Sequence, residues 1–301
     1  MDLKKKVTIL VNSCDKYSDL WTPFFTLLYK YWPGCDLEIL LNTETKNYRF
    51  NGLNIDRCPT QFGAETSYGL RMITTVSNIK TDYLLLLLDD FFIRRLVDVE
   101  KLKDIIGWMD CDDNIACFNF AANNDNSVND EKYDGYVLMN QKCAYKLNLQ
   151  AAIWRTEKFL SYWSVEDDPW KWELFVNFTT FDMNDKFYTI SDKTNAPIYY
   201  GYNDLGMGVY RGKWVYQDVK PLFEKNGLEI DYEKRGVYNP DTDKAKYHAN
   251  FKLLNYSLRR IGIKYTVMIL LFEIYKIIYK LFGKTIQYNN LPQYLNRKNK
   301  R

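Results

Sequence analysis

Residues 83–92 read Tyr-Leu-Leu-Leu-Leu-Leu-Asp-Asp-Phe-Phe, and this stretch does most to decide the fold. Five consecutive leucines bounded by polar residues are typical of a strand buried on both faces, because a buried helix usually needs a longer apolar run. Asp89 and Asp90 then lie at the carboxyl end of a central strand. In open α/β sheets, ligands bind at that edge.

The segments around this strand alternate between two patterns. Short aliphatic runs predict strands, and longer periodic runs that end in turn residues predict helices. Strands are expected at 7–12, 37–41, 55–58, 84–88, 115–120 and 150–154, helices at 20–31, 67–79 and 97–109, and short strands with Gly-rich turns between 186 and 214. The alternation predicts an α/β fold with a mixed, mainly parallel sheet flanked by helices.

The composition limits the function classes. With 301 residues, 47% of them hydrophobic, the chain has enough apolar material for a packed core. One histidine, His248, and six cysteines without a CxxC pair leave no set spaced for zinc, so reduced, buried thiols are expected. The basic start, MDLKKKVTIL, is followed by too short an apolar run for an export signal, which favours a cytoplasmic protein.

The charge is distributed unevenly along the chain. Residues 1–242 carry 28 Lys and Arg against 36 Asp and Glu, whereas residues 243–301 carry 13 against 2. We therefore expect a catalytic domain over 1–242 and a separate basic tail over 243–301. Nucleic acid and an anionic membrane both attract such a tail, and its apolar content favours the membrane.

Within the tail, residues 256–284 predict an amphipathic helix. Glu273, Lys276, Lys280 and Lys284 recur at helical spacing on one face, and apolar residues fill the remainder. The longest uncharged run within residues 256–284 is 265–272, which is too short to span a bilayer. A helix lying in the surface of an anionic membrane fits this pattern, and the alternative is a helix packed on the domain or on a dimer partner.

Asp89 and Asp90 are the candidate metal ligands. Carboxylate oxygens are hard ligands that suit Mg²⁺ or Mn²⁺, the cations that neutralise diphosphates. On extended backbone the two side chains would point to opposite faces, so that one faces a metal and the other orients a neighbouring group. Helix capping or a solvated pair is the alternative.

Four short motifs, and the order in which they follow one another along the chain, resemble those of bacterial glycosyltransferases of the GT-A type from polysaccharide and lipopolysaccharide assembly. They are Leu-Leu-Leu-Asp-Asp-Phe-Phe at 86–92, Val-Asn-Ser-Cys-Asp-Lys-Tyr at 11–17, Gln-Ala-Ala-Ile-Trp-Arg at 150–155 and Arg-Gly-Lys-Trp at 211–214. The resemblance covers about residues 5–220. It implies a GT-A-like, Rossmann-type nucleotide-sugar fold whose acidic motif carries the metal. Phe91 stands where the common Asp-x-Asp motif has its second aspartate.

The resemblance also implies a donor site at the first strands. Ser13, Asp15 and Tyr17 follow the first strand, where such enzymes hold the base and ribose, and Arg71 precedes the leucine strand within reach of a diphosphate. Asp89 is expected to contribute to donor binding as well. Asp15 is alternatively a helix cap, and Arg71 a solvated helical residue.

Glu173 is the candidate general base, since the acceptor hydroxyl must lose a proton as it attacks the sugar. Its place near the start of a helix after the strand at 150–154 matches the base of related inverting enzymes. Trp170 and Trp172 beside it are candidates for an acceptor platform, because sugar C–H faces pack on aromatic rings. Asp167 and Asp168 are rival bases, and Glu173 is alternatively an ordinary acid of a helix N-terminus.

Arg211 and Lys213 follow the Gly-rich run Gly206-Met207-Gly208 and are candidates for a cationic clamp on the donor diphosphate. The alternation over 209–215 equally describes an edge strand with outward cations. His248 is too isolated to be assigned a role.

These residues together predict a metal-dependent glycosyltransferase of cell-surface polysaccharide synthesis. Its partners would be a nucleotide-diphosphate sugar, a glycan or lipid-linked acceptor and the inner face of the plasma membrane, with no nucleic acid. A nucleotidyltransferase is the first alternative, although no Gly-rich basic loop for a triphosphate follows Val11. A non-catalytic, membrane-associated carbohydrate-binding subunit is the second.

Overall fold

The computed structural model describes the chain except for residues 58–61, 64, 122–126, 202–206, 244–250 and 282–301. The main sheet has the order β3-β2-β1-β4-β8-β5-β9-β7-β6. Its strands are β1 Val7–Asn12, β2 Glu38–Asn42, β3 Asn54–Arg57, β4 Tyr83–Leu88, β5 Ile115–Asn119, β6 Ser127–Tyr133, β7 Tyr136–Met139, β8 Ala152–Arg155 and β9 Lys186–Ile190. Within it, β7 and β8 run opposite to the other strands.

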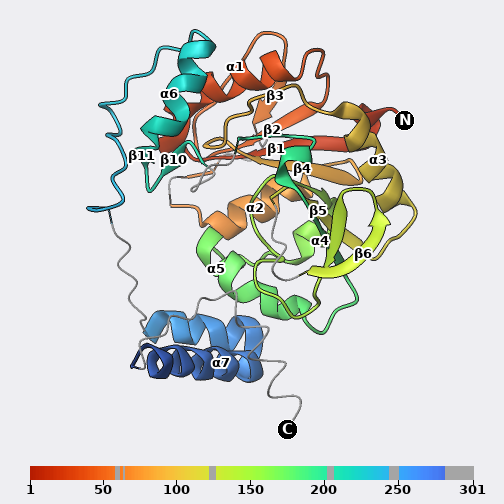
Figure 1. Cartoon of the computed structure of the whole chain (residues 1–301), viewed down its shortest axis with the longest axis vertical. Helices are drawn as coiled ribbons and strands as arrows, with labels where there is room; N and C mark the ends of the chain where they lie inside the picture. The colour runs from red at the N-terminus through yellow and green to blue at the C-terminus, as the bar shows by residue number, and fades with distance from the viewer. Residues whose placement is uncertain (58–61, 64, 122–126, 202–206, 244–250, 282–301) are drawn as a thin grey trace.

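Helices cover both faces of this sheet (Figure 1). The α-helices are α1 Trp21–Tyr31, α2 Tyr68–Ser77, α3 Val99–Asp110, α4 Thr156–Ser161, α5 Pro169–Phe175, α6 Tyr216–Lys225 and α7 Phe251–Leu281. Short 3-10 helices lie at η1 Leu3–Lys5, η2 Asp15–Leu20, η4 Val176–Thr180 and η5 Lys193–Asn195, and a small hairpin pairs β10 Val209–Tyr210 with β11 Lys213–Trp214. The predicted α/β class, with a mixed sheet flanked by helices, is confirmed.

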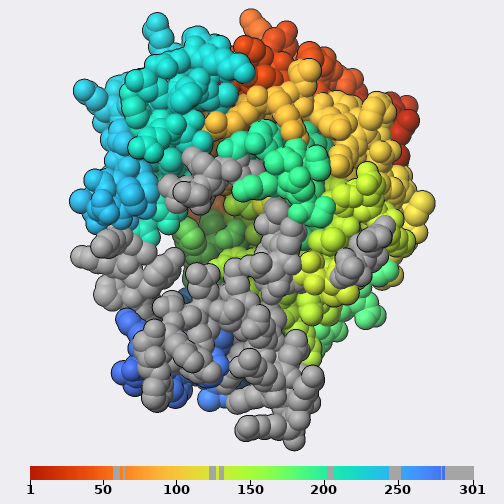
Figure 2. Space-filling view, viewed as in Figure 1, coloured from red at the N-terminus to blue at the C-terminus, as the bar shows by residue number. Residues whose placement is uncertain are grey.

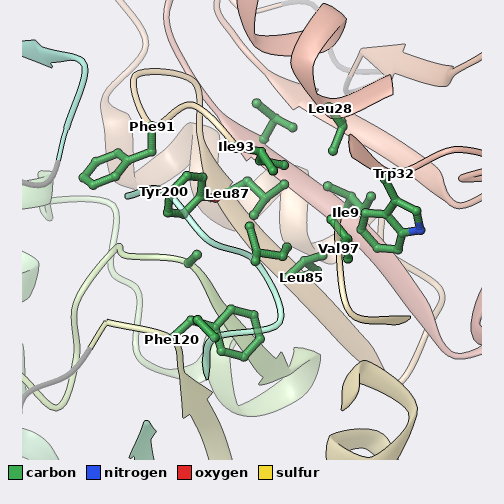
Figure 3. Packing of buried hydrophobic residues seen from close by; sticks show 14 of the residues in the cluster. Ile9, Leu28, Trp32, Leu85, Leu87, Phe91, Ile93, Val97, Phe120 and Tyr200 are labelled. Atoms are coloured by element: carbon green, nitrogen blue, oxygen red, sulfur yellow. The ribbon is translucent and has the colours of Figure 1, made fainter. Parts of the chain in front are cut away.

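The central strand β4 separates two hydrophobic cores. Leu85 and Leu87 pack with α1, α3 and α6 on one face, whereas Leu84 and Leu86 pack with α2, α4 and α5 on the other. Figure 3 shows the first core, where Leu85 and Leu87 lie among side chains such as Ile9 of β1. Burial on both faces is the property that the leucine run predicted.

No strand was predicted in the polar residues that follow β5. Ser127–Tyr133 nevertheless form β6, and β7 follows at the edge of the sheet. Helix α6 was not predicted either. The cysteines bear out the expected thiols in part: Cys14, Cys35, Cys117 and Cys143 are free and at least partly buried, Cys111 is free and exposed, and Cys58 lies outside the described residues.

The predicted tail helix is broken. Helix α7 begins at Phe251, and Gly262 interrupts it with φ 77° and ψ 172°, so that its two segments lie side by side as separate rods (Figure 1). Tyr256, Tyr265 and Phe272 pack with Phe175 and Phe178 of the α5–η4 region. The tail therefore contacts the domain through one face, while its residues after 281 lie outside the described chain.

Two helical glycines make opposite predictions about stability. A Cβ at Gly69 in α2 would lie 2.1 Å from the backbone oxygen of Ser164 and 2.9 Å from that of Asp167, whereas a Cβ at Gly107 in α3 meets no atom within 4 Å. We expect Gly69→Ala to lower the free energy of unfolding by about 2 kcal/mol or more, because backbone oxygens cannot move aside.

The matched control, Gly107→Ala, should raise the free energy of unfolding by about 0.5–1 kcal/mol, since alanine loses less backbone entropy in a helix. Denaturant unfolding of both variants measures the difference. Equal effects of the two substitutions would contradict the close packing of α2 on the 164–167 loop.

Candidate functional site

Three parallel strands end at the candidate site. β1 pairs with β2 on one side and with β4 on the other, and the register places Asn12 opposite both Asn42 and Leu88. The residues that follow, Ser13 after β1 and Asp89 after β4, are therefore neighbours. The structure thus brings the motif at 11–17 and the acidic pair together at this edge.

Asp89 is held inside the protein at this edge. It is 3% exposed, and its Oδ2 accepts the hydroxyl hydrogen of Ser13, whose Oγ in turn accepts from Trp21 Nε1 at 2.7 Å. Burial and the neighbouring charge of Asp90 raise the pKa of Asp89 well above its ordinary value. Asp89 is thus a positioned carboxyl group, and Ser13 is the residue that orients it.

Asp90 differs from Asp89 in being partly exposed, and no other described residue donates a hydrogen bond to its carboxylate. Burial raises the pKa of Asp90 to about 7, against the lowering effects of its own backbone N–H and of Arg235. The two acids lie in a turn rather than on extended backbone, which corrects the expectation that they face opposite sides of a strand. Their environments, not strand alternation, distinguish them.

Arg235 is a site residue that the sequence did not reveal. Its guanidinium pairs with Asp19 in η2, donates to the backbone oxygen of Lys16 at 2.9 Å and lies 4.4 Å from the centre of the Tyr17 ring. Its positive charge offsets part of the rise in the pKa of Asp89 and Asp90. No periodic pattern or motif surrounds Arg235, so only the fold reveals that it lies near the acidic pair.

Tyr17 contacts Arg235 through its ring and lies near the acidic pair. Burial and the charge of Asp90 raise the pKa of Tyr17 to about 12. Asp15, two residues earlier, points to the loop after β2, where it accepts from Thr43 Oγ1 at 2.5 Å and from the backbone N–H of Thr45 and of Lys46 at 3.1 Å. Burial opposes ionisation of Asp15, but these hydrogen bonds outweigh it and lower its pKa. Asp15 therefore fixes a loop at the edge of the site.

Arg71 is buried rather than solvated. Its Nη1 donates to the backbone oxygens of Ser13 at 2.9 Å and Asn42 at 3.1 Å, and its Nη2 lies 3.2 Å from Glu44 Oε1. These contacts tie the ends of β1 and β2 together. In this structure Arg71 supports the strand ends, and its expected contact with a diphosphate stays a prediction.

Glu173 lies on α5 with one carboxylate oxygen in use. Oε1 accepts the backbone N–H of Leu149 at 2.8 Å, and burial raises the pKa of Glu173 to about 7. Burial, and to a smaller extent the charge of Glu173, raises the pKa of Tyr68, whose hydroxyl accepts from Asn12 at the end of β1. Glu173 therefore lies near a tyrosine that contacts the end of β1, and its pKa is suited to accepting a proton near neutrality.

The two rival acids have other partners. Asp168 caps α5 by accepting from the backbone N–H of Lys171 at 2.9 Å. Asp167 has no exposed side-chain surface and pairs with Arg260 and Tyr256 of α7. Of the three candidate acids, Glu173 is the one that has a carboxylate oxygen without a partner among the described residues.

The two tryptophans of the expected acceptor platform differ in their exposure to solvent. Trp170 is 66% exposed and stays a candidate. Trp172 is wrong as a platform residue, because it has no exposed surface and stacks on Trp163 with ring centres 4.6 Å apart. At a helical spacing of two residues, the side chains point to different sides of α5.

Arg211 and Lys213 lie at the β10–β11 hairpin. Arg211 occupies the turn with φ 54° and donates to the backbone oxygen of Asp243 at 2.6 Å, and Lys213 pairs with the Asp243 carboxylate at 2.7 Å. Their predicted contact with a diphosphate stays a prediction. Gly206 and His248 lie outside the described residues.

A divalent cation fits this site only in part. Over the ranges that the structure describes, no group of three or more His, Cys, Asp and Glu side chains is arranged to hold a metal. Phe91 offers no ligand and packs on Tyr200 in the core (Figure 3). Asp90 is partly exposed and has a raised pKa, so its carboxylate is suited to act as one ligand of a cation. Asp89 is bonded to Ser13 and is suited to support Asp90 rather than to bind the cation. Diphosphate oxygens and water would have to complete the coordination.

The molecular surface is hollowed between two segments. Figure 2 shows this recess between the cyan residues that follow β10 and the green residues around α5. Both segments follow the acidic pair in sequence. The recess leaves room for a ligand on this face of the molecule.

The burial of Asp90 makes a prediction about stability. Because its pKa is raised in the folded state, Asp90 favours folding below the unfolded pKa, and this contribution is lost as the pH rises through about 7. We expect Asp90→Asn to be more stable than the parent protein by about 1 kcal/mol above that pH, in the absence of divalent cations. Thermal unfolding in a chelator over a pH series measures this.

The control is Asp104→Asn, a substitution on the exposed surface of α3. It should leave the pH dependence of the melting temperature unchanged. A parent-like pH profile for Asp90→Asn would contradict the raised pKa.

Comparisons with known proteins give only distant likenesses. No protein-family model matches the chain, and a search of curated proteins finds no match. The structure of S. aureus TarS residues 1–349 aligns with a TM-score of 0.41 at 13% identity, over 76% of this chain and 68% of that one. Its complex with UDP-GlcNAc aligns with a TM-score of 0.37 at 14% identity, over 76% and 69%. A longer TarS structure aligns with a TM-score of 0.42 at 12% identity, over 85% of this chain and 43% of that one. Likenesses this distant assign no activity, so a function has to be argued from the residues.

Proposed function

We propose that this protein is a glycosyltransferase that transfers a sugar from a nucleotide-diphosphate donor to a glycan or lipid-linked acceptor, with inversion, in cell-surface polysaccharide synthesis. One observation carries the proposal: Asp89 and Asp90 lie at the carboxyl end of the central strand, and both have raised pKa values. Strong pKa shifts at a ligand-binding sheet edge are typical of functional sites.

The donor side consists of the ends of β1 and β4. When bound, Mn²⁺ or Mg²⁺ would neutralise the charge of the leaving diphosphate. Asp90 would hold that cation, with Asp89 fixed beside it by Ser13. The loop that carries Asp15 and Tyr17 would receive the nucleoside, because Arg235 and Thr43 hold it against the strand ends.

The acceptor side is formed by α5. Glu173 would take the proton of the acceptor hydroxyl, because Leu149 orients one of its oxygens and burial raises its pKa to about 7. Trp170, exposed on the same helix, would pack against the acceptor sugar. Arg211 and Lys213 would approach the diphosphate only after leaving Asp243.

The role of Glu173 predicts a pH dependence. At saturating metal and donor the rate should rise as Glu173 loses its proton near pH 7, since only the carboxylate accepts a proton. Saturation matters because a bound cation keeps Asp90 ionised, which leaves Glu173 as the titrating group. Hydrolysis of the donor, with water as acceptor, gives the rate without knowledge of the natural acceptor.

Glu173→Gln should lower kcat by about 10²–10⁴-fold and leave the KM for the donor nearly unchanged. Glu157→Gln on α4, an exposed glutamate, is the matched control and should behave as the parent does. If Glu173→Gln keeps the parental rate and pH profile, another group is the base.

The acidic pair provides the test of the function itself. A panel of nucleotide-diphosphate sugars is incubated with the full chain and Mn²⁺, and the released nucleotide diphosphate is measured. Asp89→Asn and Asp90→Asn should each lower release at least about 10²-fold, because the charge that binds the cation is removed. Asp104→Asn is the control. Release that persists unchanged in both site variants would refute the assigned site.

The same assay, extended to nucleoside triphosphates mixed with sugar phosphates, separates the alternatives. A nucleotidyltransferase would release pyrophosphate from a nucleoside triphosphate and a sugar phosphate. A carbohydrate-binding subunit would release no nucleotide from any donor. Either result would overturn the proposed transfer.

A further inference from the structure

Helix α7 is fixed to the domain through its first segment and its turn. Arg260 and Tyr256 both contact Asp167, at 3.0 Å and 2.7 Å from its Oδ1, and the Asp167 side chain is fully buried. Just after the break at Gly262, Lys264 and Tyr265 contact Asp182. These bonds set which face of the second segment points away from the domain.

That outward face is apolar. After the break, aliphatic side chains recur at alternating intervals of four and three residues, which places them in one stripe along the helix. Its members are Ile263, Val267, Leu270, Ile274, Ile277 and Leu281, and they are between 44% and 79% exposed. Leu271 and Ile278 widen the stripe on one side. A contiguous aliphatic stripe of this length on a surface marks a binding face.

Positive charges border the stripe. Lys264 lies on one side of it on the helical surface, and Lys276 and Lys280 lie on the other. Glu273 is the one acidic residue of the second segment, and it pairs with Lys276 at 2.9 Å. From residue 243 to the end, the sequence carries 13 basic residues against 2 acidic ones.

This charge selects one kind of occupant. A second copy of the chain would bring the same cations face to face, which opposes association, whereas anionic lipid headgroups complement them. An aliphatic stripe between cations is also the arrangement of helices that lie in a membrane surface. Among the described helices, none is both long and apolar enough to cross a membrane.

We propose that residues 263–281 of α7 lie in the surface of an anionic membrane, with the aliphatic stripe among the acyl chains and Lys264 and Lys280 at the headgroups. The contacts of Arg260 and Tyr256 with Asp167, and of Tyr265 with Asp182, then hold the rest of the protein at a fixed orientation to the bilayer. This surface goes beyond the proposed transfer and does not depend on it.

The test is co-sedimentation of the full chain with vesicles of phosphatidylcholine mixed with phosphatidylglycerol, and with vesicles of phosphatidylcholine alone. The parent should pellet with the mixed vesicles, more weakly at high salt. The variant Leu270→Gln, Ile274→Gln, Ile277→Gln should bind at least about 100-fold more weakly, because three aliphatic side chains leave the acyl region.

One variant is the control for these substitutions, and a second pair of substitutions tests the cations. Leu96→Gln, Val128→Gln, Val237→Gln changes three exposed aliphatic residues outside α7 and should bind as the parent does. Lys264→Gln, Lys280→Gln should weaken binding to the mixed vesicles about tenfold or more, since each cation near an anionic surface contributes to binding. Lys5→Gln, Lys225→Gln is its matched control. Circular dichroism and melting temperature verify that each variant is folded.

Three results would overturn the proposal. They are a parent protein that stays in the supernatant with the mixed vesicles, an aliphatic-stripe variant that binds as the parent does, and a parent dimer in sedimentation equilibrium that this variant converts to monomer. The last result would assign the stripe to a second copy. None of them bears on donor hydrolysis, so a failure here is distinct from a failure of the proposed transfer.

Discussion

The burial of β4 on both faces is the constraint on which the site depends. Its leucines contribute to two cores at once, Leu84 and Leu86 to one and Leu85 and Leu87 to the other, so the strand cannot shift without disturbing both. Neighbouring strands on each side also fix its register. The acidic pair that follows is therefore held in place by most of the hydrophobic interior. A rigid position allows two carboxyl groups to remain close together despite their unfavourable environment.

The electrostatics of the site place stability and function in opposition. Asp89 is buried and Asp90 is partly buried beside it, and both have raised pKa values, so in the absence of a cation ionisation of the pair lowers the stability of the folded protein. The positive charge of Arg235 offsets part of this loss of stability. Arg235 is distant in sequence and is held in place by its contacts with Tyr17 and Asp19. A bound cation would offset more of this loss of stability. The unfavourable pair of carboxyl groups would then serve to bind that cation. Sites of this kind tend to cost stability elsewhere in a protein.

The sequence predicted the parts of the structure that depend on local patterns. The leucines at 84–88 predicted a central strand, because a strand that is buried on both faces has a continuous apolar sequence. The sequence of residues 127–133 did not predict β6, because an edge strand is partly exposed to solvent and its polar sequence is similar to that of a loop. The sequence around Trp172 does not indicate that its side chain is buried. The break in α7 depends on the positive φ of Gly262, which glycine permits but does not require. Arg235 reaches the site only through tertiary contacts, which no local pattern encodes.

The central claim is that the acidic pair is a cation-dependent site for a nucleotide diphosphate. The most direct measurement is the melting temperature of the full chain with UDP, GDP, ADP and dTDP, each with and without Mn²⁺. A ligand that binds only the folded state raises the melting temperature, so one nucleotide should stabilise the protein in the presence of Mn²⁺ and lose that effect in Asp90→Asn. Stabilisation by none of the nucleotides, or equal stabilisation of the parent and Asp90→Asn, would contradict the account.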